Sequence, residues 1–230
     1  TWSKVKHIKG VVDVKRGRVF SKLSREIIMA AKAGGGDPRL NARLRTAMDA
    51  ARAQNMPNDT IERAIKKGTG ELGGEAPSEI TYEGYAPGGV AMMVECVTDN
   101  KNRTSADLRS VFTRNHGSLG TPGRVTPLFS RTGDIRLPLA SAEEETLLEA
   151  ALEAGADDIS HDGEDHVILT APDQLFAVGD ILKARHLTPA SQKLIFIPLT
   201  TIPVVDLATA QQVIRLYEAL DDLDDVQNVH

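Results

Sequence analysis

The sequence predicts a multidomain α+β protein: an N-terminal all-α three-helix module, then two α+β domains, the last ferredoxin-like and inserted in the second. Three observations predict this class. Apolar residues recur at helical spacing over the first 70 residues. Residues 68–79, rich in Gly, Pro and Glu, have the composition of a linker. Beyond the linker, short apolar runs of strand length alternate with helical segments, in a chain of 230 residues that can form two or three compact domains.

Three helices with short connections are expected in the N-terminal module. Gly34 would end the first helix, because glycine readily adopts the left-handed cap conformation. Asp37 suits the N-cap of the second helix, and Pro38 suits its first turn. Gly68 would end the third helix. The expected segments are residues 13–33, 37–54 and 57–67.

The second domain is expected to combine strands with a helix. Residues 90–97 form a short apolar run of strand length, and residues 83–89 before it have the composition of a tight turn. Thr104 and Asp107 resemble a capping box and would begin a helix that runs to residue 115. Residues 125–130 are expected to form another strand.

Residues 134–200 follow the order β-α-β-β-α-β, which is typical of a split βαβ, ferredoxin-like unit. Its strands are expected at residues 134–139, 158–160, 166–171 and 193–199, and its helices at residues 143–154 and 172–185. A helix over residues 207–220 and a strand over residues 226–229 follow this complete unit, so we expect the unit to be an insertion. The predicted domains are residues 1–76, residues 77–132 with 202–230, and residues 133–201.

The charge is divided unevenly along the chain. Residues 1–70 carry 16 Lys/Arg and 6 Asp/Glu, a net charge of +10, whereas residues 71–230 carry 11 and 26, a net charge of −15. Such an asymmetry indicates a polyanionic partner for the basic end. The alternative is a basic surface that docks on the acidic body of the same protein.

Basic residues of the first predicted helix form a stripe opposite its apolar face, about 160° away at 100° per residue. A cationic stripe about 25 Å long matches the repeated charge of a phosphate backbone. Trp2 beside it could stack on a base or anchor the segment against a helix. The predicted nucleic-acid-binding residues are Lys4, Lys6, His7, Lys9, Lys15, Arg16, Arg18, Lys22, Arg25 and Lys32.

A second polar cluster lies at the entrance of the helix expected near residue 104. It consists of Asp99, Asn100, Asn102 and Arg103. Capping and turn-building explain these residue types, and a recognition loop on the acidic body is the alternative. Neither interpretation assigns a contact to a particular base.

The sequence contains no pattern that predicts catalysis, a metal site or a cofactor. The six histidines lack zinc-site spacing, and the Asp-Gly pair between His161 and His166 indicates a turn. Cys96 lies in an apolar run and is expected to be a buried, inert thiol. No apolar run reaches the length of a membrane span and no signal peptide precedes the basic segment, so we expect a cytoplasmic protein or, for an organellar member, a mitochondrial matrix protein.

Eight ordered motifs resemble the YebC/PmpR family. They are WxxxKH (2–7), KRGRxFxKL (15–23), GGGDP (34–38), NMP (55–57), IERA (61–64), YEGYxPGG (82–89), DNxNRT (99–104) and LxxxDDVQNV (220–229). The resemblance implies three domains, the last inserted into the second, and a regulator of gene expression without enzymatic activity. Bacterial members of that family are described as DNA-binding transcriptional regulators. Others resemble translation factors, including the mitochondrial translational activator of cytochrome c oxidase subunit I.

We therefore predict a nucleic-acid-binding regulator that has no cofactor and does not bind a membrane. The alternatives are a ribosome- or RNA-associated translation factor of the same family, and a protein-interaction module whose acidic α+β body binds a partner. The family usually carries Gly-His-Ser-Lys before the tryptophan, whereas this chain starts at Thr1, so no contact is assigned to that segment. The pattern does not select DNA or RNA, a target sequence, a regulated gene or an oligomeric state.

Overall fold

The computed structural model describes the backbone of residues 2–230 and the side chains from Arg16 onward. Its contacts divide the chain into two compact units, residues 1–126 with 202–229, and residues 127–201 with residue 230. The first unit contains the helical region and one sheet, and the second contains the other sheet. Four short 3-10 segments occur at Pro87–Gly89, Thr126–Leu128, Leu139–Ser141 and Pro172–Gln174.

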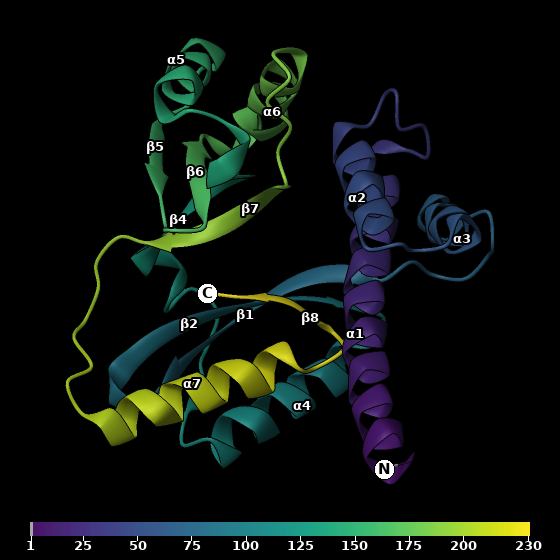
Figure 1. Cartoon of the computed structure of the whole chain (residues 1–230). Coiled ribbons are helices and arrows are strands. Elements are labelled where there is room, and N and C mark those ends of the chain that lie inside the picture. The colour runs from purple at the N-terminus through teal and green to yellow at the C-terminus, as the bar shows by residue number, and fades with distance from the viewer. Residues whose placement is uncertain (1) are drawn as a thin grey trace. The chain divides into compact units, whose positions relative to one another are not determined.

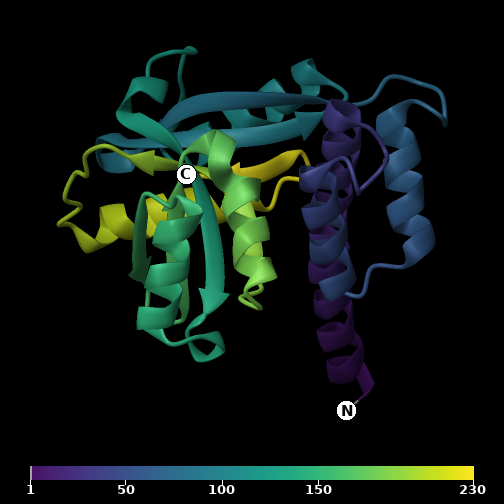
Figure 2. The ribbon, with the colours of Figure 1, turned by 90° about the horizontal axis from the view of Figure 1, so that it is seen from above.

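The helical region consists of α1 (Trp2–Gly34), α2 (Ala42–Ala53) and α3 (Asn58–Thr69). The structure confirms a three-helix N-terminal region, with α2 and α3 beside the C-terminal half of α1 (Figure 1 and Figure 2). α1 begins well before the expected residue 13 and continues through Gly10, a residue type that costs a helix interior about 1 kcal/mol relative to alanine. The core of the region is formed by Ile27, Ile28, Ala30, Ala31, Leu44, Ala47, Met48, Ala51, Met56, Ile61 and Ala64.

The start of α2 differs from the prediction. Asn41, rather than Asp37, is the N-cap, and its Oδ1 accepts a hydrogen bond from the backbone N–H of Leu44 at 3.0 Å. The Asn41 amide also donates to the carbonyls of Ala30 and Gly35, each at 2.8 Å. One buried side chain therefore satisfies both the end of α1 and the start of α2, which a cap at Asp37 does not do.

The end of α3 also differs from the prediction. Gly68 lies within the helix, and Gly70 is the C-cap, with a left-handed φ of 83°. A Cβ atom added at Gly68 would lie 2.4 Å from the carbonyl oxygen of Ile28. This position is therefore glycine because α1 and α3 pack closely there, and the helix does not end at it.

The first sheet is antiparallel, with the order β3-β1-β2-β8. Its strands are β1 (Ser78–Ala86), β2 (Val90–Thr98), β3 (Ser118–Leu119) and β8 (Val226–Val229). Helices α4 (Lys101–Arg114) and α7 (Leu207–Asp221) cover one face of it (Figure 1). The core between them contains Met92, Val94, Cys96, Leu108, Phe112, Leu216 and Leu220.

Two local predictions in this region are corrected. α4 begins at Lys101 with Asn100 as its N-cap, so Thr104 lies one turn inside the helix. The segment expected to be a turn from residue 83 belongs to β1 as far as Ala86, and only residues 87–89 turn. Glu83 is consequently a buried strand residue.

The second unit contains an antiparallel sheet of order β5-β6-β4-β7. Its strands are β4 (Phe129–Pro138), β5 (Asp158–His161), β6 (Asp165–Thr170) and β7 (Ser191–Pro198), and its helices are α5 (Glu144–Ala154) and α6 (Leu175–Ala184). β4 is one strand where two were expected, at residues 125–130 and 134–139, because β7 pairs with it continuously from Phe129 to Arg136. Within the part of the chain that the structure describes, no helix combines the length and apolarity needed to span a membrane.

Candidate nucleic-acid interface

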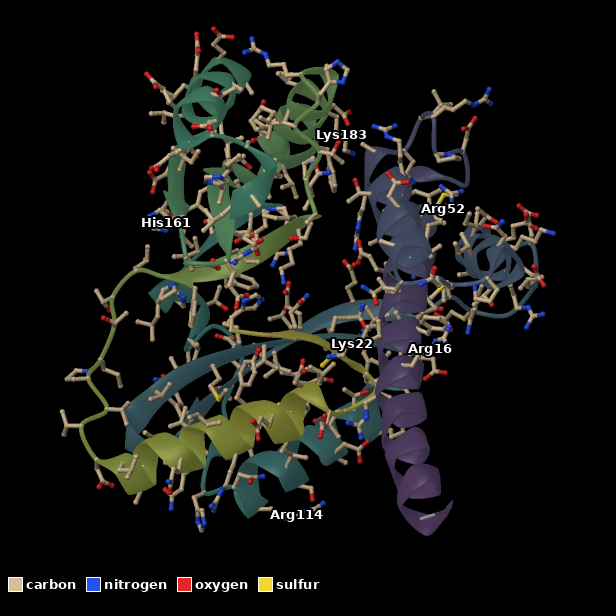
Figure 3. All side chains as sticks on the ribbon, viewed as in Figure 1. Arg16, Lys22, Arg52, Arg114, His161 and Lys183 are labelled. Carbon is tan, nitrogen blue, oxygen red and sulfur yellow. The ribbon has the colours of Figure 1, made fainter. Side chains whose placement is uncertain are left out.

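The predicted basic stripe lies on α1, and the structure describes part of it. The side chains of Lys4, Lys6, His7, Lys9 and Lys15 lie outside the described residues. Arg16 is exposed, and its guanidinium lies 5.3 Å from the ring centroid of Phe20, a cation–π contact (Figure 3).

Further along α1, the basic stripe meets acidic residues from the end of the chain. We call residues 221–225, at the end of α7 and before β8, the acidic turn. Arg18 Nη1 donates to Asp222 Oδ1 at 2.7 Å. Lys22 Nζ donates to Asp221 Oδ1 at 2.7 Å and to the Asp221 carbonyl at 3.0 Å (Figure 3). These two cations therefore already have counter-charges within the protein.

Arg25 continues the same contact one turn later. Its guanidinium donates to the backbone carbonyl of Asp224 and lies 3.5 Å from Asp225 Oδ1. Gln227 Nε2 donates to the Lys22 carbonyl at 3.0 Å. Residues 18, 22 and 25 lie on one face of the helix, since their spacing is four and three residues. In this part of the stripe the contacts are those of the alternative stated above, in which the basic surface docks on the acidic body of the same protein.

Asp225 joins α1 to α4. Its carboxylate accepts hydrogen bonds from Arg103 Nη2 at 3.1 Å and from Thr104 Oγ1 at 2.8 Å, in addition to the ion pair with Arg25. Its side chain is only 13% exposed, so solvent screens these interactions less than those of Asp221 and Asp222. The hydrogen bonds that Arg103 donates to Asp225 and Asp99 raise the pKa of Arg103, which stays charged.

The candidate recognition loop makes contacts within the protein. Asn100 caps α4 by accepting from the backbone N–H of Arg103 at 3.0 Å. Arg103 Nη2 lies 2.9 Å from Asp99 Oδ1, and this hydrogen bond lowers the pKa of Asp99. Asn102 is exposed. The contact of Asn100 is the one that the capping interpretation expects, whereas Arg103 also makes a long-range ion pair with Asp225.

Two further basic residues of the same helical region make contacts within the protein. Lys32, the last predicted stripe residue, donates to the carbonyl of Pro77 at 3.1 Å. Arg43 of α2 bonds Glu26 at 2.8 Å and Glu79 of β1 at 2.6 Å. Burial lowers the pKa of Arg43, but its hydrogen bonds to these two carboxylates raise it by more. The pKa of Arg43 therefore lies above its ordinary value. Sequence reasoning did not find this bridge, because its three residues are far apart in the chain.

Glu83 is a buried carboxylate that sequence reasoning assigned to a turn. It accepts hydrogen bonds from the backbone N–H groups of Gly123 at 2.5 Å, Val125 at 2.7 Å and Thr126 at 2.7 Å. Burial raises its pKa, but the three backbone hydrogen bonds together lower it below the ordinary value. Glu83 therefore holds the last residues before the second unit in place.

The other candidate sites have structural explanations. Burial raises the pKa of Cys96 to about 12, so its thiol is inert at neutral pH. Asp162 builds the turn between β5 and β6 by accepting from the N–H groups of Glu164 and Asp165. Among the residues whose side chains are described, no group of three His, Cys, Asp or Glu is placed to hold a metal ion.

The Gly-rich loop after α1 does not form a phosphate cradle. A hollow of about 420 Å³ lies between this loop and α3, and its lining residues include three carboxylates and one lysine. Such a lining repels an anion rather than attracting it. The lining charges are Asp37, Glu62, Glu71 and Lys66.

Comparisons with known proteins cover the whole chain. Residues 1–71 match a family model described as the TACO1/YebC protein N-terminal domain, and residues 77–230 match one described as the TACO1/YebC second and third domain. These two family models together divide the family into three domains.

Full-length relatives have similar names. A probable transcriptional regulatory protein of Aquifex aeolicus is 49% identical over 228 residues, which cover 99% of this chain and 92% of that protein. A protein of the same description from Akkermansia muciniphila is 49% identical over 230 residues, which cover 99% of this chain and 92% of that protein. Another, from Geobacter sulfurreducens, is 49% identical over 229 residues, which cover 100% of this chain and 92% of that protein. These names describe regulatory proteins and name no reaction.

A solved structure has the same fold. The crystal structure of a conserved hypothetical protein from Aquifex aeolicus superposes with a TM-score of 0.89 at 49% sequence identity. The match covers 95% of this chain and 90% of that chain.

Proposed function

The chain belongs to the TACO1/YebC family, and we propose that it is a non-enzymatic regulator of gene expression that binds DNA through α1. The observation that carries the proposal is the concentration of positive charge, +10 in residues 1–70 against −15 in the remainder. A phosphate backbone is the polyanion that such a helix fits. The names of the full-length relatives favour DNA and transcription over other polyanions.

The proposed contacts are to phosphates rather than to bases. The chain has 4% aromatic residues, which gives few platforms for base stacking. The contact residues proposed are the ten named from the sequence, with Arg16 and the cations before it contributing most. Arg103 Nη2 is already bonded to Asp99 and Asp225, and we propose no base contact for the loop around it.

Two other functions remain as alternatives. A ribosome- or RNA-associated translation factor would use the same charge, because RNA presents the same phosphates. A protein-interaction module is favoured by a specific observation, the ion pairs that Arg18, Lys22 and Arg25 already make within the chain. In that function the acidic α+β body would bind the partner.

The test removes charge from the first part of α1. The test variant is the full chain with Lys4, Lys9, Lys15 and Arg16 changed to Gln. We expect it to bind a 20-base-pair duplex about 10- to 100-fold more weakly at 0.15 M salt, because phosphate contacts are lost. Each lost contact should also make the slope of log affinity against log salt less steep by about 0.9. The control changes three exposed cations of α3, Arg63, Lys66 and Lys67, to Gln, and it should lose less affinity per charge removed. Equal binding by the α1 variant and the wild type would contradict the proposal, and tighter binding to structured RNA than to DNA would favour the translation factor.

We also propose the finer domain division. Residues 1–76 form the helical domain, residues 77–132 with 202–230 the second, and residues 133–201 a ferredoxin-like domain inserted in it. The strand order β5-β6-β4-β7, with antiparallel neighbours and the chain order βαββαβ, supports this assignment. The start of β4 at Phe129 moves the first boundary a few residues earlier.

A further inference from the structure

We propose that the acidic turn is a built-in competitor for phosphate, which occupies cations of α1 until a nucleic acid displaces it. The inference rests on the proposed function and adds regulation of the same surface. Three cations at four- and three-residue spacing, Arg18, Lys22 and Arg25, all contact the acidic turn. Carboxylate and phosphate oxygens accept the same charge-assisted hydrogen bonds from guanidinium and ammonium groups.

The acids of the turn lie where local structure disfavours them. Asp221 ends α7 and Asp222 is its C-cap, and the last turn of α7 contains no basic residue. The C-terminus of a helix carries a partial negative charge, so carboxylates at this position destabilise the helix. Their favourable partners are therefore the cations of α1. A local conflict of this kind is expected where a sequence serves function rather than stability alone.

The ion pairs between α1 and the acidic turn differ in exposure, and the more exposed pairs exchange more readily. Arg18 and Asp222 are 42% and 60% exposed, and Lys22 and Asp221 are 27% and 45% exposed. Exposed ion pairs of this kind are weak, so a polyanion can replace the carboxylates. Asp225, at 13% exposed, also holds Arg103 and Thr104. We infer that phosphates take over Arg18 and Lys22 first, and that the Arg25–Asp225 pair exchanges last and keeps α1 attached until then.

Because an anion must displace the acidic turn to bind α1, the acidic turn makes α1 selective among anions. A free phosphate ion has no condensed counterion atmosphere, so its exchange with the carboxylates gains nothing from counterion release. A polymer with regularly spaced phosphates can take both positions together, and the release of its counterions drives the exchange. The acidic turn therefore lowers affinity for all anions but penalises short ones most.

The experiment compares the wild type with D221N/D222N in the full chain, using a 20-base-pair duplex and inorganic phosphate as probes. Because the acidic turn penalises short anions most, inorganic phosphate should gain proportionally more affinity from the substitution than the duplex does. We expect the variant to bind the duplex about three- to tenfold more tightly, as the loss of two weak competing pairs implies. The control E145Q/E149Q removes two exposed acids of α5 in the other unit, and it should change affinity less. Thermal unfolding checks that both variants fold.

Each outcome decides the question. If the wild type binds the duplex and D221N/D222N binds with unchanged or lower affinity, the competitor is refuted while the proposed function stands. If neither protein binds, the proposed function fails and the competitor fails with it. An equal gain in duplex affinity in E145Q/E149Q would mean that the effect comes from net charge alone, and it would refute the proposed role of the acidic turn. Binding by the variant alone, or a gain confined to it, supports the inference.

Discussion

At the scale of single residues, Glu83 is the clearest case of a buried charge that the fold needs. Its carboxylate accepts three backbone hydrogen bonds, from Gly123, Val125 and Thr126. We expect Glu83→Gln to lower the free energy of unfolding by about 2–3 kcal/mol, because the amide presents a donor to N–H groups that need an acceptor. Chemical denaturation measures the change, and Glu149→Gln on the exposed face of α5 serves as the control.

The same residue predicts a pH dependence. The folded pKa of Glu83 is below the ordinary value of 4.5, so its contribution is fully present above that pH and is lost as pH falls through the folded pKa. Wild type and Glu83→Gln should therefore approach one another in stability at acid pH. A stability difference that stays constant from pH 7 to pH 3 would contradict this account.

The residues that sequence reasoning placed correctly are those whose role is local. Cys96 was expected to be a buried thiol, and the structure buries it. Asp162 follows its local turn chemistry. Glu83 was misplaced because its three partners lie about 40 residues away in the chain. No pattern within its own segment indicates that the carboxylate is buried.

At the scale of elements, the contact between α1 and α3 depends on a glycine. A Cβ atom at Gly68 would meet the Ile28 carbonyl at 2.4 Å and the Ala31 Cβ at 2.8 Å. We expect Gly68→Ala to destabilise the protein by about 2 kcal/mol or more, because two backbones must move apart. Gly17→Ala is the matched control, since nothing lies within 4 Å of its Cβ position. Alanine there should stabilise the helix by up to about 1 kcal/mol. Thermal unfolding of both variants measures the contrast, and equal effects of the two substitutions would be inconsistent with close packing at Gly68.

Element types were predictable, and several of their boundaries were not. Apolar spacing indicated three N-terminal helices, and the structure has them. Asp37 and Asn41 are equally good caps by residue type, and the choice of Asn41 depends on its bonds to the end of α1. Likewise, the continuity of β4 follows from pairing with β7, which lies about 60 residues further along the chain.

At the scale of the whole molecule, the division of charge was predictable, but its internal pairing was not. The basic segment and the acidic turn are both visible in the sequence. Their contact joins residues about 200 positions apart, and only the fold brings them together. The candidate site therefore has two parts. One consists of cations that are paired within the first unit, and the other consists of the cations of residues 1–16, whose binding to phosphate is predicted from the sequence alone.

The central claim is that this helix binds a phosphate backbone, and the salt dependence of binding tests it most directly. The measurement is a titration of a 20-base-pair DNA duplex with the full chain at several salt concentrations between 0.05 and 0.3 M, analysed as the logarithm of affinity against the logarithm of salt. With about five phosphate contacts, the account predicts a straight line with a slope of about −4 to −5. A slope near zero, or no binding at the lowest salt, would contradict it.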